Sequence, residues 1–204
     1  MNGTIMKAKK LLMITGIVIA SLAVVIAGLA YFLIGPFERP EAEFVTLKEP
    51  IKMIGISTRT DMKSVYSDVP KLGKEYQALK EKGAIPNNKE PWAFVAISKD
   101  FRDDGTWEYL MGDVVTTLDT IPPGLQSFEI PATTFAVFPI RPKSSFAWGI
   151  EIGRTKKYIF TEWLPTSGYE PDPTILGDFE YHDERSVTDN PEVALYVAVK
   201  QTKD

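Results

Sequence analysis

The residue whose setting most suggests chemistry is Glu180, which stands between Phe179 and Tyr181 in residues 178–184 (DFEYHDE). This run is typical of a β-strand, in which alternate side chains point to opposite faces, so Glu180 shares a face with His182. A carboxylate among aromatic residues is costly to ionise unless it meets a cation or a hydrogen-bond donor. Glu180 is therefore the first candidate for ligand binding. The alternative is a solvent-facing residue of the strand.

Flat aromatic side chains are a second feature suited to ligand binding. Tryptophan and tyrosine rings can stack on an aromatic ligand or attract a cation. Most large aromatic residues nevertheless belong to the core, and we expect this of Trp92. The aromatic candidates are Trp107, Trp148, Trp163, Tyr66, Tyr109, Tyr158 and Tyr181.

Composition excludes several kinds of catalytic and metal site. The sequence has no cysteine, so it forms no disulfide, thiolate metal site or thiol nucleophile. Its only histidine is His182, which excludes a multi-histidine zinc site. His182 and its two adjacent acids cannot all point at one ion from a strand. Phosphate-binding loops and nucleophile elbows have glycine spacings that this sequence lacks. We expect no metal and no cofactor.

An apolar segment near the N-terminus indicates where the protein resides. Residues 11–35 (LLMITGIVIASLAVVIAGLAYFLIG) contain no charged side chain. A helix of that length reaches roughly 37 Å, more than the ~30 Å hydrocarbon core of a bilayer. Lys7, Lys9 and Lys10 precede it, so the positive-inside rule predicts a cytoplasmic tail at 1–10 and the rest of the chain outside the cytoplasm. The alternative is a cleaved secretory signal, although the apolar stretch is long for one.

The remaining chain is predicted to be a linker followed by one domain. Pro36, Pro40 and Pro50 punctuate an acidic stretch at 36–50, which we expect to be a semi-extended stalk. Residues 51–204 suffice for one compact domain. After position 35 the chain has 27 acidic and 20 basic residues, a net charge of −7. It therefore lacks the clustered basic surface of a nucleic-acid-binding protein.

The order of predicted elements repeats within this domain. Hydrophobic periodicity gives strand, helix, strand, strand, and the same order returns about eighty residues later. We therefore predict an α+β fold in which two such units pair their sheets about a pseudo-twofold axis. The expected elements are a strand at 51–57, a helix at 65–82, strands at 92–98 and 107–115, a strand at 133–140, a helix at 145–164, and strands at 178–184 and 193–200.

Two stretches resemble the GyrI-like small-molecule-binding family, which supplies the effector-binding domain of AraC-type and MerR-type multidrug-responsive regulators. They are residues 162–170 (EWLPTSGYE) and 179–185 (FEYHDER), supported by residues 130–138 (IPATTFAVF) and the last strand. The resemblance covers about residues 51–200. It implies a duplicated strand-helix-strand-strand fold with an aromatic groove between the halves. It also implies a buried glutamate that meets cationic or polar ligand groups, and this falls on Glu180.

The resemblance also selects among the other candidates. Tyr109 and Met111 share the face of a strand that lines the groove in this fold. Regulators of the family carry a helix-turn-helix unit, whereas here only ten residues and the apolar segment precede the stalk, so we expect no DNA binding. The ligand-binding residues expected beside Glu180 are Tyr109, Met111, Trp148, Trp163 and Tyr66.

Together these features predict a membrane-anchored domain that binds small apolar or cationic molecules, as a sensor or a sequestering protein. A membrane partner could transmit its signal. One alternative is a hydrolase, because some GyrI-like members are similar to enzymes that open strained rings of genotoxic compounds. Glu180 would then activate water, with Tyr109 as the acid or orienting group. The other alternative is an interaction module whose groove takes a peptide or a partner protein.

Protease protection tests the predicted topology. In intact spheroplasts, protease added outside should degrade the domain and leave a short membrane-embedded fragment, because the lysines before the apolar segment hold the N-terminus in the cytoplasm. Immunoblotting against a tag at each end follows the fragments. Full protection of the domain until the cells are lysed would reverse the orientation.

Overall fold

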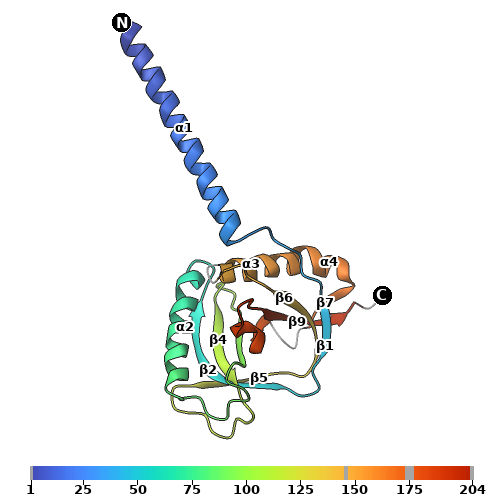
Figure 1. Cartoon of the computed structure of the whole chain (residues 1–204). Helices are drawn as coiled ribbons and strands as arrows, with labels where there is room; N and C mark the ends of the chain where they lie inside the picture. Colours follow the sequence, from blue (N-terminus) through green and yellow to red (C-terminus); the bar gives the residue numbers. More distant parts are fainter. Residues whose placement is uncertain (1, 145–146, 173–176, 203–204) are drawn as a thin grey trace.

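The computed structural model describes residues 2–144, 147–172 and 177–202, which form an N-terminal helix and an α+β domain (Figure 1). The helix α1 (Asn2–Leu33) projects away from the domain. Its segment Met13–Leu33 is long and apolar enough to cross a membrane, and none of it is buried inside the protein. The predicted span at 11–35 therefore overlaps a free-standing apolar helix.

One antiparallel sheet forms the centre of the domain. Its strand order is β1-β6-β9-β8-β3-β4-β2-β5, and β7 pairs with β9 beside this path. The strands are β1 (Glu43–Thr46), β2 (Ile51–Thr60), β3 (Phe94–Lys99), β4 (Trp107–Val114), β5 (Gln126–Ile130), β6 (Thr134–Ile140), β7 (Tyr169–Pro171), β8 (Asp178–His182) and β9 (Val193–Gln201). The helices of the domain are α2 (Val65–Glu81), α3 (Trp148–Tyr158), the π-helical η2 (Ile159–Trp163), α4 (Leu164–Ser167) and the 3-10 helix η3 (Glu184–Val187).

The strand order is symmetric about its centre, as the predicted duplication requires. The first unit is β2, α2, β3 and β4, and the second is β6, α3, β8 and β9. The third elements of the two units, β3 and β8, pair at the middle of the sheet. Outward from them on each side come the last strand and then the first strand of the unit. The α+β duplicated fold is therefore confirmed.

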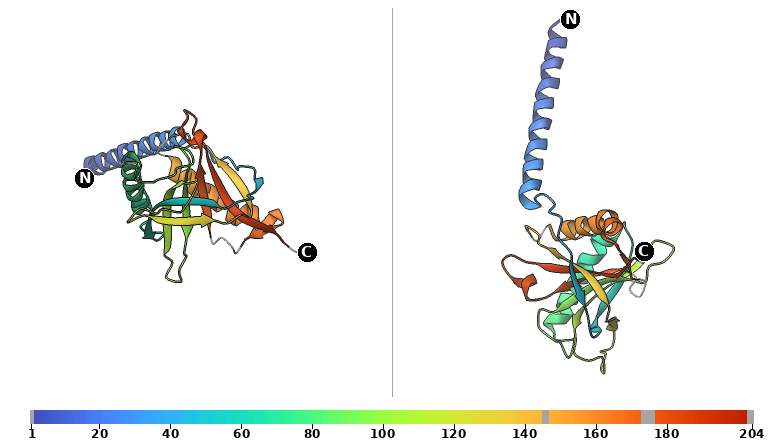
Figure 2. Two further views of the ribbon diagram at one scale, coloured as in Figure 1. Left: turned by 90° about the horizontal axis from the view of Figure 1, so that it is seen from below. Right: turned by 90° about the vertical axis from the view of Figure 1, so that its right-hand side faces the viewer.

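The two faces of the sheet have different roles. The sheet is curved (Figure 2). Met53, Val95, Phe135 and Phe179 are fully buried in a hydrophobic core on one of its faces. The other face carries the helices, with α2 on β2 and β4 and with α3 on β6. Alternation along the strands places Glu180 and Tyr109 on this helix-bearing face.

Part of the expected stalk belongs to the sheet. Residues 43–46, which the sequence places in the linker at 36–50, form β1 and pair with β6. The apolar side chains in this short strand explain the pairing, since Val45 packs against the hydrophobic core and the Phe44 ring stacks on Tyr169 with centroids 4.6 Å apart. Earlier in the linker, Arg39 forms an ion pair with Glu162 at 2.6 Å. The linker therefore lies along the surface of the domain.

The second helix changes its winding along its length. The sequence predicts one helix at 145–164, of which residues 145–146 lie outside the described residues. The α-helical α3 passes into the π-helical η2 and then into α4. A π turn holds an extra residue and rotates the side chains that follow it. Trp163, the last residue of η2, lies edge-on to Phe138 with ring centroids 5.0 Å apart.

A glycine pair between β2 and β4 gives a stability prediction. Gly55 and Gly112 are register partners, and a Cβ on Gly112 would lie 2.5 Å from the carbonyl oxygen of Ile54. We expect Gly112→Ala to lower the free energy of unfolding by about 1–3 kcal/mol, because the backbones must separate. The control Gly153→Ala, at an open helical position, should be neutral or stabilise by up to about 1 kcal/mol. Equal urea midpoints for Gly112→Ala and the wild type would show that the backbones of β2 and β4 do not approach closely at this position.

Candidate functional site

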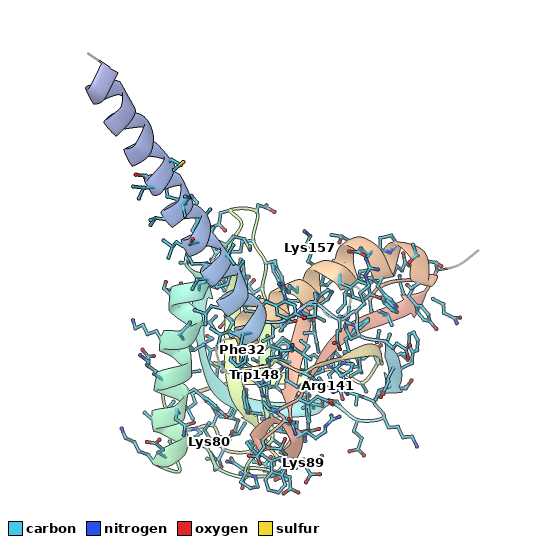
Figure 3. The ribbon with its side chains drawn as sticks, turned by 45° about the horizontal axis from the view of Figure 1, so that its top comes forward. Phe32, Lys80, Lys89, Arg141, Trp148 and Lys157 are labelled. Atoms are coloured by element: carbon cyan, nitrogen blue, oxygen red, sulfur yellow. The ribbon has the colours of Figure 1, made fainter. Side chains whose placement is uncertain are left out.

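A cavity of about 580 Å³ lies on the helix-bearing face, beside α2. Its walls combine aromatic and apolar side chains with a few polar ones, the mixture typical of small-molecule sites. Figure 3 shows Lys80 on α2 and Trp148 at the start of α3. The lining residues are Gly73, Tyr76, Gln77, Lys80, Glu81, Pro91, Trp92, Phe94, Met111 and Val187.

A row of polar side chains on β8 begins where this apolar lining ends. Phe94 pairs with His182, and Ala96 pairs with Glu180, across the centre of the sheet. Directly opposite residues share a face, so Asp178, Glu180 and His182 all point to the helix side. The ring of His182 stacks on Phe94 with centroids 3.8 Å apart. The cavity wall and the carboxylates of β8 are therefore adjacent.

Glu180 is a buried carboxylate with only long contacts. It is 5% exposed. Lys156 Nζ lies 3.7 Å from its Oε1, His182 Nε2 lies 3.9 Å from its Oε2, and the Tyr109 hydroxyl donates to Oε1 at 3.4 Å. Burial acts to raise the pKa of Glu180, but His182, Lys156 and Tyr109 outweigh burial and hold this pKa below its ordinary value. Glu180 is thus ionised at neutral pH and can accept a closer donor.

The close partner of Lys156 is Asp178. Lys156 Nζ lies 2.7 Å from Asp178 Oδ1. Burial opposes the charge of Lys156, but Asp178 and Glu180 outweigh it and raise the lysine pKa. Burial also raises the pKa of Asp178, which Lys156 only partly offsets. With both carboxylates ionised, one lysine leaves the group with one excess negative charge.

Tyr109 joins the two halves of the domain at this point. It comes from β4 in the first unit, and Glu180 comes from β8 in the second. Burial, followed by the charge of Glu180, raises the pKa of Tyr109 well above its ordinary value. The hydroxyl therefore stays protonated and remains a donor. Leu72 of α2 packs in the same buried cluster as Tyr109, so the first helix covers this side of the site.

A third buried carboxylate of this region, Asp113, lies across Phe94 from His182, and sequence reasoning missed it. Asp113 is fully buried and is the register partner of Phe94 on β4. It accepts hydrogen bonds from the Tyr76 hydroxyl and from Asn88 Nδ2, the latter at 2.8 Å. Its cation is Lys80, whose Nζ lies 3.1 Å away. Helical periodicity assigns Lys80 to the wet face of α2, and only the fold shows that it turns inward.

The structure brings four of the six predicted site residues to this region. Met111 lines the cavity. Tyr109 and Glu180 are in hydrogen-bond contact beside it. Trp148 lies near the ring of His182, with centroids 6.1 Å apart.

The other two predicted residues lie elsewhere. Trp163 packs on Phe138 at one end of the second unit, and Tyr66, in the first turn of α2, is 74% exposed. Of the six predicted residues, only Met111 lines the cavity itself. Trp163 and Tyr66 have the aromatic chemistry of a groove residue, but this chemistry does not determine which face of an element they occupy.

A second hollow, of about 450 Å³, lies between the linker and the second unit. Its lining is largely charged, and Arg39, Arg141 and Glu151 are already held in ion pairs. In the described part of the chain no three His, Asp or Glu side chains are grouped to hold a metal ion. We take the cavity beside α2, together with Glu180, as the candidate ligand site because the lining of this cavity is mainly apolar and aromatic.

Removing the lysine from this site should have a pH-dependent effect on stability. We expect Lys156→Met to lower the free energy of unfolding by about 3–5 kcal/mol near neutral pH, because two buried carboxylates lose their cation. Without Lys156 the already raised pKa of Asp178 rises further, and Glu180 loses one of the groups that lower its pKa, so the folded state takes up protons more readily as the pH falls. The deficit should therefore shrink towards about pH 5.

Denaturant unfolding of both forms at the two pH values measures this effect. Lys157→Met removes the neighbouring exposed lysine and is the matched control, with little expected change at either pH. A deficit of the same size at both pH values would contradict a charge effect and would leave only lost packing.

Three solved structures share this fold at low sequence identity. A Staphylococcus aureus protein described as a bacterial transcription regulation protein is 14% identical, with a TM-score of 0.59 over 79% of this chain and 99% of that chain. SAV2435, solved bound to tetraphenylphosphonium, is 13% identical, with a TM-score of 0.58 over 78% and 94% of the two chains. An integron cassette protein from Vibrio cholerae is 12% identical, with a TM-score of 0.54 over 78% and 96%. A comparison with curated proteins gave no match.

The family model of Cass2, described as integron-associated effector binding protein, matches residues 45–199. The match begins in β1 and ends in β9, so it spans both units and the strands that carry Tyr109 and Glu180. It also contains the stretches 162–170 and 179–185 on which the GyrI-like resemblance rests, and that resemblance is confirmed. The chain belongs to the Cass2 family of integron-associated effector binding proteins.

Proposed function

We propose that this protein binds a small, mainly apolar molecule that carries a positive or hydrogen-bond-donating group. The ligand occupies the cavity beside α2, and Glu180 is its polar anchor. The observation that carries the proposal is the setting of Glu180, which is buried and ionised but has no contact closer than 3.4 Å in the interactions described above. A ligand cation can approach more closely than Lys156, which is already held by Asp178.

The cavity sets the rest of the ligand's chemistry. A volume of about 580 Å³ lies within the range of small-molecule sites, roughly 300–1,000 Å³. Trp92, Phe94 and Met111 offer flat or polarisable surfaces to an aromatic body. Tetraphenylphosphonium, the compound bound to SAV2435, is a lipophilic aryl cation, which supports the same ligand class here.

Binding is the function that the geometry supports best, ahead of hydrolysis. The hydrolase alternative uses Glu180 as a base and Tyr109 as an acid. In the structure the Tyr109 hydroxyl donates to Glu180, and its raised pKa makes it a poor proton donor, while the lowered pKa of Glu180 makes that carboxylate a weak base. A fixed donor next to a carboxylate suits a site that orients a ligand.

The membrane anchor gives this binding activity a location. We assign α1 to a single membrane span with the domain outside the cytoplasm, supported by the free apolar segment and the lysines before it. The linker that leaves α1 is tied to the second unit, since Ser144 Oγ donates to the Leu33 carbonyl at 2.9 Å and Arg154 donates to the Gly35 carbonyl at 3.3 Å. Arg154 lies on α3, which also carries Lys156. The protein would act as a membrane-bound sensor or sequestering protein.

The test is the affinity for tetraphenylphosphonium in the wild type and in Glu180→Gln. The variant keeps the shape of the side chain and removes its charge. We expect the cation to lose about tenfold or more in affinity, because its attraction to Glu180 is a charge–charge interaction in a site shielded from water. The neutral dye Nile red should bind both forms alike. Equilibrium dialysis of the full chain in nanodiscs measures both ligands.

Glu184→Gln is the matched control, because this exposed glutamate follows shortly after Glu180 in the sequence. It should bind both probes like the wild type. Unchanged tetraphenylphosphonium affinity in Glu180→Gln would remove Glu180 from the site. If the wild type binds neither tetraphenylphosphonium nor Nile red, the proposed ligand class is wrong.

A further inference from the structure

We propose that Lys80 is a second recognition point in the same cavity, where its ammonium group donates to a neutral hydrogen-bond acceptor of the ligand, such as a carbonyl oxygen. This inference rests on the proposed binding function and narrows the ligand class. The ligand would carry an acceptor at the α2 end of the cavity in addition to its apolar body.

The position of Lys80 makes this contact available. It lies in the last turn of α2 and lines the cavity, and its side chain is 24% exposed. Its Nζ lies above the rings of Tyr76 and Phe94, 5.8 and 5.7 Å from their centroids. An ammonium group has three N–H donors. Among the described residues its ion-pair partner is the Asp113 carboxylate, which leaves donors for a ligand.

Asp113 and its partners hold the lysine in place. Asp113 is fully buried, and it also accepts hydrogen bonds from the Tyr76 hydroxyl and from Asn88. Burial and the charge of Asp113 raise the pKa of Tyr76, so this hydroxyl stays a donor. A lysine fixed in this way loses little side-chain freedom when it meets a ligand, which favours binding.

The charge balance selects a neutral acceptor. Lys80 and Asp113 together carry no net charge, so an anionic group would gain little from the pair while losing its own hydration. A carbonyl oxygen is cheaper to desolvate and still receives a hydrogen bond from a charged donor.

The site would then have two polar groups with opposite preferences, Lys80 in the lining of the cavity and Glu180 beside the cavity on β8. Phe94 pairs with Asp113 on one side and with His182 on the other. Lys80 therefore lies towards β4 and Glu180 towards β8, on the two sides of the Phe94–His182 stack. An aromatic molecule with an acceptor at one end and a donor or cation at the other fits both.

Fluorenone and fluorene test the Lys80 contact, because they share one tricyclic frame and differ by a carbonyl oxygen. The full chain in nanodiscs is dialysed against each probe, and all variants use the same nanodiscs so that partitioning into lipid cancels. We expect the wild type to bind fluorenone about tenfold more tightly than fluorene. Lys80→Met should abolish this preference by weakening fluorenone alone, and Lys80→Arg should keep most of it.

Two further variants control for effects on folding. Lys74→Met removes an exposed lysine of the same helix and should keep the preference. The double variant Lys80→Met/Asp113→Asn removes the ammonium group without leaving an unpaired buried charge. Like Lys80→Met, it should lose the preference for fluorenone over fluorene.

The outcomes separate this inference from the proposed function. Two results would overturn the Lys80 contact alone: a preference for fluorenone that survives in Lys80→Met, or no such preference in the wild type. If Glu180→Gln still lowers the affinity for tetraphenylphosphonium in that case, the binding function stands and Lys80 only links α2 to the sheet. If the wild type binds neither tricyclic probe nor tetraphenylphosphonium, the proposed binding function itself fails, and the Lys80 contact with it.

Discussion

Two carboxylates, Asp178 and Glu180, are buried two residues apart on the strand at the centre of the sheet. Burying them together is unfavourable, and Lys156 from α3 is the cation that offsets the cost. Because the lysine binds Asp178 closely, Glu180 keeps much of its charge and has only long contacts. The position of α3 on the sheet, the closure of the second unit and the polarity of the ligand site all depend on this one arrangement.

The duplicated fold explains why such a site forms between the halves. The pseudo-twofold arrangement pairs β3 with β8 at the centre of the sheet, and each unit places its own long helix outward of that pair. The strip between the helices is therefore lined from both units, with Tyr109 and Met111 from the first and Glu180 and His182 from the second. A ligand held there would contact both halves, and α3, which carries Lys156, also donates a hydrogen bond from Arg154 to the Gly35 carbonyl of the linker.

Local patterns in the sequence were enough to predict the core strands, both long helices and the placement of Glu180 on one face of its strand. Those features depend on periodicity within a single element, which a sequence displays directly. The short strands β1, β5 and β7 were missed because they are stabilised by partners far along the chain. The Lys80–Asp113 pair was missed for a related reason, since it depends on how α2 lies on the sheet. Trp163 and Tyr66 have side chains suited to a ligand site but lie away from the cavity, because residue type alone does not determine position in the fold.

The structure of the protein with tetraphenylphosphonium bound would test the central claim most directly. We expect the phosphonium to occupy the cavity between α2 and β8, with Glu180 as its nearest carboxylate and with Lys156 still paired with Asp178. A cation bound in the charged hollow beneath the linker, or one placed beside α2 with Glu180 still out of contact, would contradict this claim.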